Sequence, residues 1–182
     1  MKRREFIKKA GLSSAALASL PVAAGGLTSP AWADDEEAGT WFRFVVVSVT
    51  PTGSDLVAIN GAGKFGDSWI QGRGSFTHWV PTGSPPFPIV AAGYWRATSF
   101  VGFTSNGVYG TLESGVLELG ATFRSTIPGP ARLPAEMRVV CNVGPGALLT
   151  GEHEGVFIHV AEFEFEPLEP ELGLTIFVPA PG

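Results

Sequence analysis

Histidine, arginine and glutamate side chains are the residues of this chain that could transfer protons or bind a polar group. The stretch "GEHEGVFIHVAEFEFEP" (151–167) holds His153 and His159 among several glutamates. Residues 153–165 are consistent with one strand, in which alternate side chains lie on opposite faces. Two histidines six positions apart would then lie ~20 Å apart, too far to share a metal ion with ligands at ~2.0–2.2 Å. We therefore expect no metal site, but a strand with His159 in an aromatic packed face and a solvated acidic end.

A second group of candidates lies on three consecutive predicted strands. In "RGSFTHWV", Phe76 and His78 share one face, and in "GYWRATSF" a single face carries Tyr94, Arg96 and Phe100. If these faces point inward, the residues meet inside the sheet or at its mouth, with Glu113 as the partner of Arg96, because a buried arginine needs a partner or a ligand. This predicts a ligand-binding site. In the alternative interpretation, Arg96 faces solvent and the tryptophans fill the core. The ligand-binding candidates are Phe76, His78, Tyr94, Arg96, Phe100 and Glu113.

Other motifs give no support for a cofactor or a nucleophile. The glycine pattern "GAGKFG" (61–66) is not followed by the helix that a dinucleotide site requires. A Ser-His-Asp arrangement would depend on Asp55 or Asp67, which both lie in predicted turns. Cys141 alternates with Met137 and Val139 and is expected to be an inert core residue without an internal disulfide. We therefore predict neither a cofactor nor a metal.

The first 33 residues have the composition of an export signal. A basic start is followed by a stretch rich in alanine, leucine and glycine, which ends in Ala31-Trp32-Ala33, an A-x-A cleavage pattern. The segment Arg3–Lys8 ("RREFIK") resembles the twin-arginine export motif, with Lys2 in place of the usual hydroxyl residue and Ile7 in place of leucine. The alternative is an ordinary secretory signal. Either implies an exported protein, periplasmic or extracellular, with no membrane insertion after cleavage.

The charge balance of the remaining chain restricts its partners. After residue 33, seven lysines and arginines stand against sixteen carboxylates, a formal charge of about −9. Nucleic acids and anionic membrane surfaces bind proteins through basic footprints. We therefore expect neither as a partner, whereas a small apolar ligand or a homo-oligomer is compatible with this charge.

Alternation of apolar and polar residues predicts an all-β fold, and no window has a sustained helical period. Glycine and proline turns separate the segments. The pairs "GAGKF" (61–65) and "GRGSF" (72–76) suggest bulges in a strongly curved sheet, which favours a closed barrel. We predict a single small antiparallel barrel of about eight strands, with a β-sandwich as the alternative. The predicted strands are 41–50, 55–62, 72–80, 89–104, 108–123, 135–143, 155–165 and 172–178.

The expected organisation is a cleaved export signal (1–33), an acidic leader (34–40) and one barrel domain (41–182). The spaced glycine hairpins, "VVCNVGPG", "HEGV" and "GLTIFV" resemble a family of small secreted bacterial proteins. The barrel that this resemblance implies is similar in shape to allene oxide cyclase and dirigent barrels, which hold apolar ligands. Three hypotheses follow: a barrel that binds a small apolar or aromatic ligand in its lumen, a cofactor-free isomerase or cyclase, and a self-associating structural protein of the cell envelope.

Overall fold

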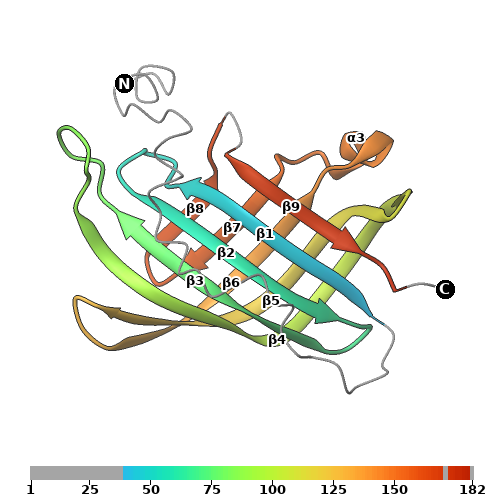
Figure 1. The fold of residues 1–182 in the computed structure, drawn as a ribbon, viewed down its shortest axis with the longest axis horizontal. Helices are drawn as coiled ribbons and strands as arrows, with labels where there is room; N and C mark the ends of the chain where they lie inside the picture. Colours follow the sequence, from blue (N-terminus) through green and yellow to red (C-terminus); the bar gives the residue numbers. More distant parts are fainter. Residues whose placement is uncertain (1–38, 170–171, 181–182) are drawn as a thin grey trace.

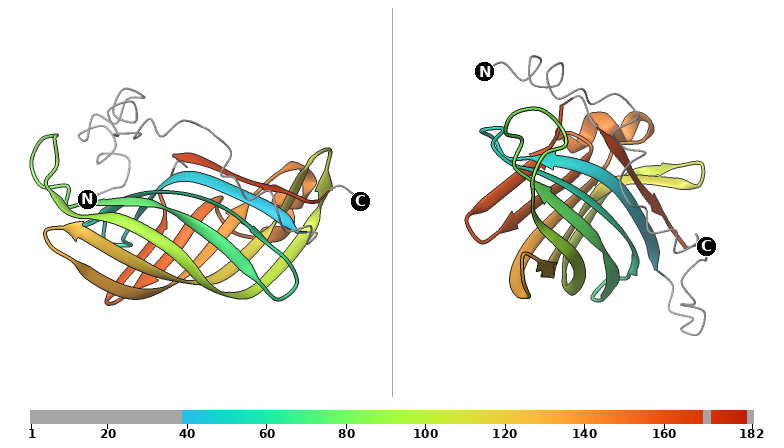
Figure 2. Two further views of the ribbon diagram at one scale, coloured as in Figure 1. Left: turned by 60° about the horizontal axis from the view of Figure 1, so that its bottom comes forward. Right: turned by 60° about the vertical axis from the view of Figure 1, so that its left-hand side comes forward.

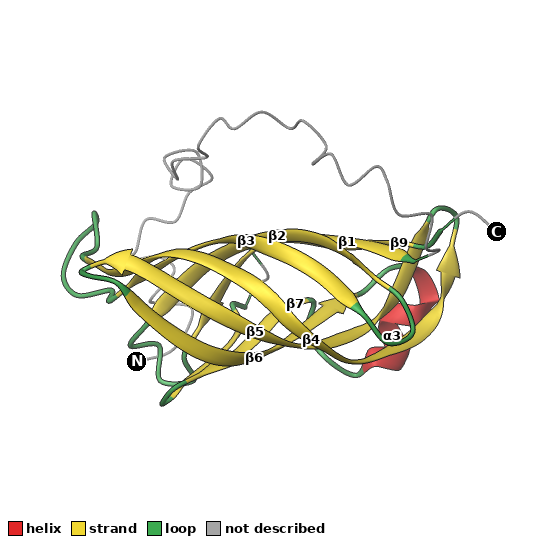
Figure 3. Cartoon of the chain, turned by 90° about the horizontal axis from the view of Figure 1, so that it is seen from below, coloured by secondary structure: helices red, strands yellow, loops and turns green. Residues whose placement is uncertain are grey.

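The computed structural model describes residues 39–169 and 172–180, and they form one antiparallel sheet that closes into a ring (Figure 1). The only helical segments in this part are the 3₁₀ turn η1 (Gly144–Gly146) and the single turn α3 (Ala147–Thr150) at one end of the ring (Figure 3). The strands are β1 (Thr40–Val49), β2 (Leu56–Phe65), β3 (Ile70–Trp79), β4 (Ile89–Tyr109), β5 (Leu112–Ile127), β6 (Ala131–Cys141), β7 (Gly155–Val160), β8 (Phe163–Pro167) and β9 (Gly173–Val178).

The strands follow one another round the ring in sequence order from β1 to β8, and β8 pairs back onto β1 (Figure 2). β8 contacts only the last residues of β1, at Ser48 and Val49. The rest of that edge is covered by β9, which pairs with β1 and meets β5 at a single pair, Glu113 with Phe177. The ring is therefore closed, as predicted, but its wall is uneven because β9 is inserted between β1 and β5. The alternative of two packed sheets is wrong.

Two strand predictions differ from the structure. Val108 belongs to the long strand β4, and β5 begins only at Leu112. Residues 153–165 are not one strand, because a turn at Ala161 and Glu162 separates β7 from β8. Ala161 has φ 52°, in the left-handed region that residues with a side chain seldom adopt. The face assignment made by alternation from 153 therefore fails at this turn.

Aromatic side chains fill the interior from wall to wall. Phe44 of β1 stacks on Trp95 of β4, three strands away in the ring, with ring centroids 5.7 Å apart. Phe65 of β2 contacts Phe177 of β9 at 6.1 Å, and Phe76 of β3 contacts Phe123 of β5 at 5.0 Å. All six of these residues are buried. The core is thus a stack of rings between the strands.

The glycine repeat makes room for these rings. Gly61 lies opposite Gly74, and Gly63 lies opposite Gly72, so four glycines of β2 and β3 form one patch of the inner wall. A Cβ atom at Gly61 would lie 2.7 Å from Cζ of Phe44 and closer still to the ring of Trp95. The prediction that these glycines are bulges is wrong, because β2 and β3 pair without any register shift. The irregular strand is β4, whose pairing with β5 shifts at four places.

Hydroxyl groups tie β9 into the wall where the ring closes. The Oγ1 of Thr175 donates to the carbonyl of Val140 at 2.6 Å, and the Thr175 amide donates to Oε1 of Glu154 at 3.0 Å. The Oγ of Ser48 donates to the carbonyl of Val156 at 2.7 Å. Ser48 and Thr175 are completely buried. Side-chain hydrogen bonds here replace the backbone ladder that the uneven closure interrupts.

Candidate functional site

Tyr94 and Arg96 lie outside the barrel, contrary to the predicted lumen site. Tyr94 is 65% exposed and Arg96 is also exposed, whereas Trp95 between them is only 1% exposed. The indole Nε1 of Trp95 donates to the carbonyl of Asn60 at 2.8 Å, which fixes this parity of β4. Burying the large apolar ring and solvating the guanidinium is the less costly choice. The alternative interpretation, in which Arg96 faces solvent, describes the structure.

Glu113 is buried, but it is not the partner of Arg96. Arg96 pairs with Thr122 of β5, nine residues from Glu113, which corresponds to ~30 Å along a strand. Phe100 is half-buried and stacks on Phe65 at 5.9 Å. Of the six candidates, Phe76, His78, Phe100 and Glu113 therefore point inward at different levels of the barrel, and they do not form one site.

His78 lies at the opposite end of the barrel from α3, and its partner is Asp55. Its Nε2 is 2.7 Å from Oδ1 of Asp55, and the side chains are 13% and 14% exposed. The imidazole packs edge-on against the rings of Phe163 and Phe165 of β8, at 5.4 and 5.5 Å. Asp55 also accepts a hydrogen bond of 2.6 Å from the hydroxyl of Ser54.

The His78–Asp55 pair does not form a nucleophilic triad. In such a triad, histidine lies between the hydroxyl and the carboxylate, so that it can take the hydroxyl proton. Here the carboxylate of Asp55 lies between Ser54 and His78. The pair orients the imidazole and could hold or release a proton. Among the described residues, no hydroxyl is placed on its far nitrogen.

Sequence reasoning missed Asp55 as the partner of His78, although the hairpin register contains the signal. Gly61 pairs with Gly74, so Val57 pairs with His78. Asp55 precedes Val57 by two positions, which places it on the same face one level further along the barrel. The two glycine-aromatic repeats could have set this register from the sequence.

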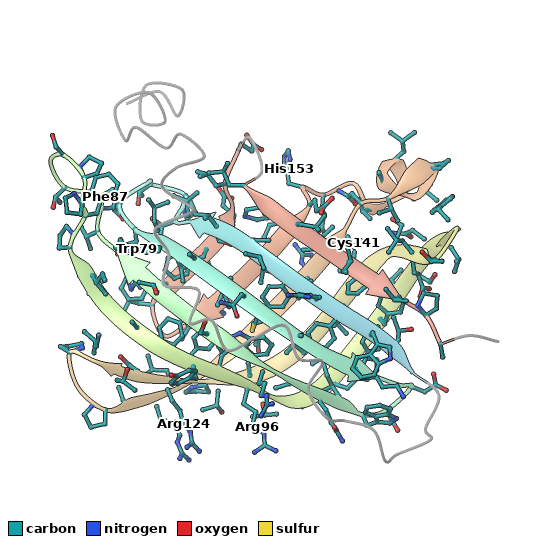
Figure 4. The ribbon with its side chains drawn as sticks, in the orientation of Figure 1. Trp79, Phe87, Arg96, Arg124, Cys141 and His153 are labelled. Atoms are coloured by element: carbon teal, nitrogen blue, oxygen red, sulfur yellow. The ribbon has the colours of Figure 1, made fainter. Side chains whose placement is uncertain are left out.

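Arg96 is part of a cluster that we call the basic surface, formed by Tyr94, Arg96, Arg124 and Arg132. Arg124 is the Cα partner of both Tyr94 and Arg132, and Arg96 pairs with Arg73 of β3. All four members are exposed, and Arg96 and Arg124 extend from the same side of the barrel (Figure 4). Like charges directly opposite each other destabilise a sheet. The fold therefore gains nothing from this arrangement.

A second cluster, which we call the acidic surface, is formed by Glu136, His159, Glu162 and Glu164. His159 is the Cα partner of both Glu136 and Glu164, and all four residues are exposed. The prediction that His159 lies in a packed aromatic face is wrong. The buried face of β7 carries Val156 and Ile158, and His159 shares the opposite, outer face with Phe157.

Cys141 lies in the core, as predicted. It is completely buried together with Val139, and its Sγ donates to the carbonyl of Thr175 at 3.2 Å. Burial raises the pKa of the Cys141 thiol from its ordinary 9.0 to about 11. At neutral pH it is a protonated, unreactive thiol.

Over residues 39–169 and 172–180, no three histidine, cysteine or acidic side chains are arranged so that they could hold a metal ion. In the same residues, no helix has the length and hydropathy needed to cross a membrane. No family model, no curated protein and no solved structure matches this chain.

Proposed function

We propose that this chain is an exported structural protein whose barrel acts through its outer surface, including contacts with other copies of itself. The observation that carries this proposal is the filled interior. Rings from opposite walls are in contact, for example Phe44 with Trp95 and His78 with Phe165. Export rests on the pattern of basic residues and the A-x-A site within the first 33 positions.

The filled interior weighs against the two lumen hypotheses. Barrels that hold a ligand leave a cavity of about 300–1,000 Å³ among their inward side chains. In this barrel, a ligand would have to displace rings that are packed together and, in Trp95, hydrogen-bonded to the backbone. A cyclase would need the same space, as well as polar groups converging on the substrate. The inward candidates His78 and Glu113 are separated instead, because one lies beside β8 and the other beside β9.

The outer surface offers more specific chemistry than the interior. Arg96, Arg124 and Arg132 form no ion pair with any described residue. Guanidinium groups bind carboxylates in a bidentate manner, and exposed tyrosine adds amphipathic contact area. A surface of this composition is typical of a binding face. Repulsion between the neighbouring arginines destabilises the isolated protein, which is a reason to expect a partner.

Native mass spectrometry of the mature protein purified from its host tests the proposal. We expect the mass of the polypeptide, or multiples of it, without a retained small molecule. An apolar fluorophore such as N-phenyl-1-naphthylamine should show no enhanced emission with the native protein. The variant Trp95→Ala serves as a control for sensitivity, because removing the buried indole creates an apolar cavity that such probes can enter. A small molecule that co-purifies at a stoichiometric ratio would contradict the proposal and favour a lumen ligand.

A further inference from the structure

We infer that the basic surface of one copy binds the acidic surface of another, so that the protein associates with itself. This inference rests on the proposed function and specifies the surfaces and the partner. The occupant of the basic surface is a second copy of this chain. Both halves of the contact are present on one molecule, and their charges are opposite.

The basic surface presents three guanidinium groups in one compact area. Arg124 and Arg132 are direct cross-strand partners, which places their Cβ atoms ~5 Å apart. Arg96 lies diagonally from Arg124, two positions along β4 from its partner Tyr94, at ~7–8 Å. All three are exposed and free of ion pairs with described residues. The area matches a group of two or three carboxylates.

The acidic surface supplies such a group. Glu136 and Glu164 lie on either side of His159 in one cross-strand row, with Glu162 in the adjacent turn. These three glutamates are exposed, and none forms an ion pair with a described residue. Glu136 and Glu164 are two strands apart, ~10 Å, because His159 lies between them. Arg96 and Arg132 are likewise two strands apart, on β4 and β6, with Arg124 of β5 between their strands. Each cluster is therefore complementary to the other in charge and in spacing.

The two surfaces adjoin each other on the outer wall of the ring. The basic surface is centred on β5 and the acidic surface on β7, and β6 carries Arg132 in the first and Glu136 in the second. Arg132 and Glu136 are both exposed and four positions apart on β6, so they lie ~13 Å apart on the same outer face. A second copy related by a two-fold rotation can therefore cover both surfaces at once, with each basic surface on the other's acidic surface.

Nucleic acid and other polyanions fit the basic surface less well. Duplex binding uses six to ten phosphate contacts, and single strands need several aromatic platforms. This surface has three guanidinium groups and one exposed tyrosine, Tyr94. The excess of carboxylates over the whole described chain would also repel a long polyanion.

Sedimentation velocity of the mature protein tests the inference with two variants. Variant A carries Arg96→Gln and Arg124→Gln, and variant B carries Glu136→Gln and Glu164→Gln. At about 50 mM salt, the wild type should form dimers or larger species as its concentration rises, and about 500 mM salt should disperse them because screening shortens the range of charge interactions. Variants A and B alone should associate at least about tenfold more weakly.

The mixture of the two variants is the discriminating measurement. Variant A retains its acidic surface and variant B its basic surface, so an equimolar mixture should form one-to-one dimers that cannot extend further. The control variant Arg43→Gln/Asp67→Asn neutralises two exposed charges outside both surfaces and should associate like the wild type. Circular dichroism and urea midpoints establish that all variants are folded.

Three results would overturn the inference: a wild type that stays monomeric at low salt, variants A and B that associate like the wild type, or a mixture without heterodimers. If the native mass spectra nevertheless contain no small molecule, the argument against a lumen ligand stands, while this inference and the self-association in the proposed function fail. A shift of the wild type by added RNA at equal salt would redirect the basic surface to a polyanion.

Discussion

Replacing Gly61 by alanine should destabilise the barrel, although alanine is ordinarily the better residue in a strand. The added methyl group would lie 2.7 Å from Cζ of Phe44 and even closer to the indole of Trp95, whereas ordinary contacts begin near 3.4 Å. Trp95 cannot tilt away freely, because it is 1% exposed and its Nε1 donates to the carbonyl of Asn60.

The expected cost follows from two effects. Overpacking a close-packed core costs about 1–3 kcal/mol. Losing or stretching the Trp95 hydrogen bond costs about 0.5–1.5 kcal/mol. Together they predict that the free energy of unfolding falls by about 2–4 kcal/mol, a large share of the stability of a typical domain. The assay is urea denaturation followed by far-UV circular dichroism, so that changes in tryptophan fluorescence do not bias the result.

A matched control and a double variant make this prediction specific. At Gly102 of β4, the nearest atom to an added Cβ is 4.0 Å away, so Gly102→Ala should be neutral or slightly stabilising. In a Trp95→Phe background, Gly61→Ala should cost at least about 1 kcal/mol less, because the atoms nearest the new methyl are gone. Unchanged stability of Gly61→Ala, or an equal cost in both backgrounds, would refute the idea that the glycines exist to accommodate the rings.

Four further predictions concern the buried thiol, the attachment of β9 and the export signal. Cys141 should resist thiol reagents at pH 8 until urea unfolds the protein, and rapid labelling in native buffer would show that the strand parity is wrong. The pKa of Cys141 is about 11 in the folded protein against an ordinary 9.0, so its contribution to stability is intact below pH 9 and is lost as the pH rises towards 11. Cys141→Ala should therefore flatten the fall of the unfolding free energy between pH 9 and 11. An unchanged slope would contradict the burial of this thiol. Thr175→Val should lower the free energy of unfolding in urea by about 1–3 kcal/mol, since the carbonyl of Val140 loses its donor. A neutral effect would mean that this hydrogen bond does not hold β9 in the wall. Replacing Arg3 and Arg4 by lysine should block export if the twin-arginine route is used. N-terminal sequencing of the exported wild type should give a sequence that begins at Asp34.

The strands could be predicted from the sequence, because alternation of apolar residues reports burial on one face. The closed sheet was also predicted correctly, but from glycine bulges that β2 and β3 do not contain. The failure at 161–162 has a physical reason. The turn contains neither glycine, proline, asparagine nor aspartate, and Ala161 adopts a positive φ without any compositional sign of it. A tight turn without a turn residue cannot be distinguished from a continuous strand by its pattern.

The site prediction failed because it placed the wrong face of β4 inside the barrel. Along β4, Tyr94 and Arg96 alternate with Trp95 and Ala97, and both faces hold an aromatic residue. The decisive contact is non-local, because Trp95 lies against the glycines of β2 and β3. Alternation identifies the two faces of a strand, but the pairing of distant strands decides which one is buried. The contact of His78 with Phe163 and Phe165 is likewise visible only once the ring is closed.

The insertion of β9 beside β1 has a consequence for the order of folding. The first described strand, β1, pairs both with β2, which follows it directly, and with β9, the last described strand. Trp41 is the partner of Lys64 in the first pair and of Val178 in the second. The apolar residues of β1 therefore stay partly uncovered until β9, the last described strand, has left the ribosome, and the ring cannot close before that point. Such long-range pairing is slow and leaves apolar strands open to aggregation in the meantime. We therefore expect the nascent chain to need protection from aggregation until β9 has been made.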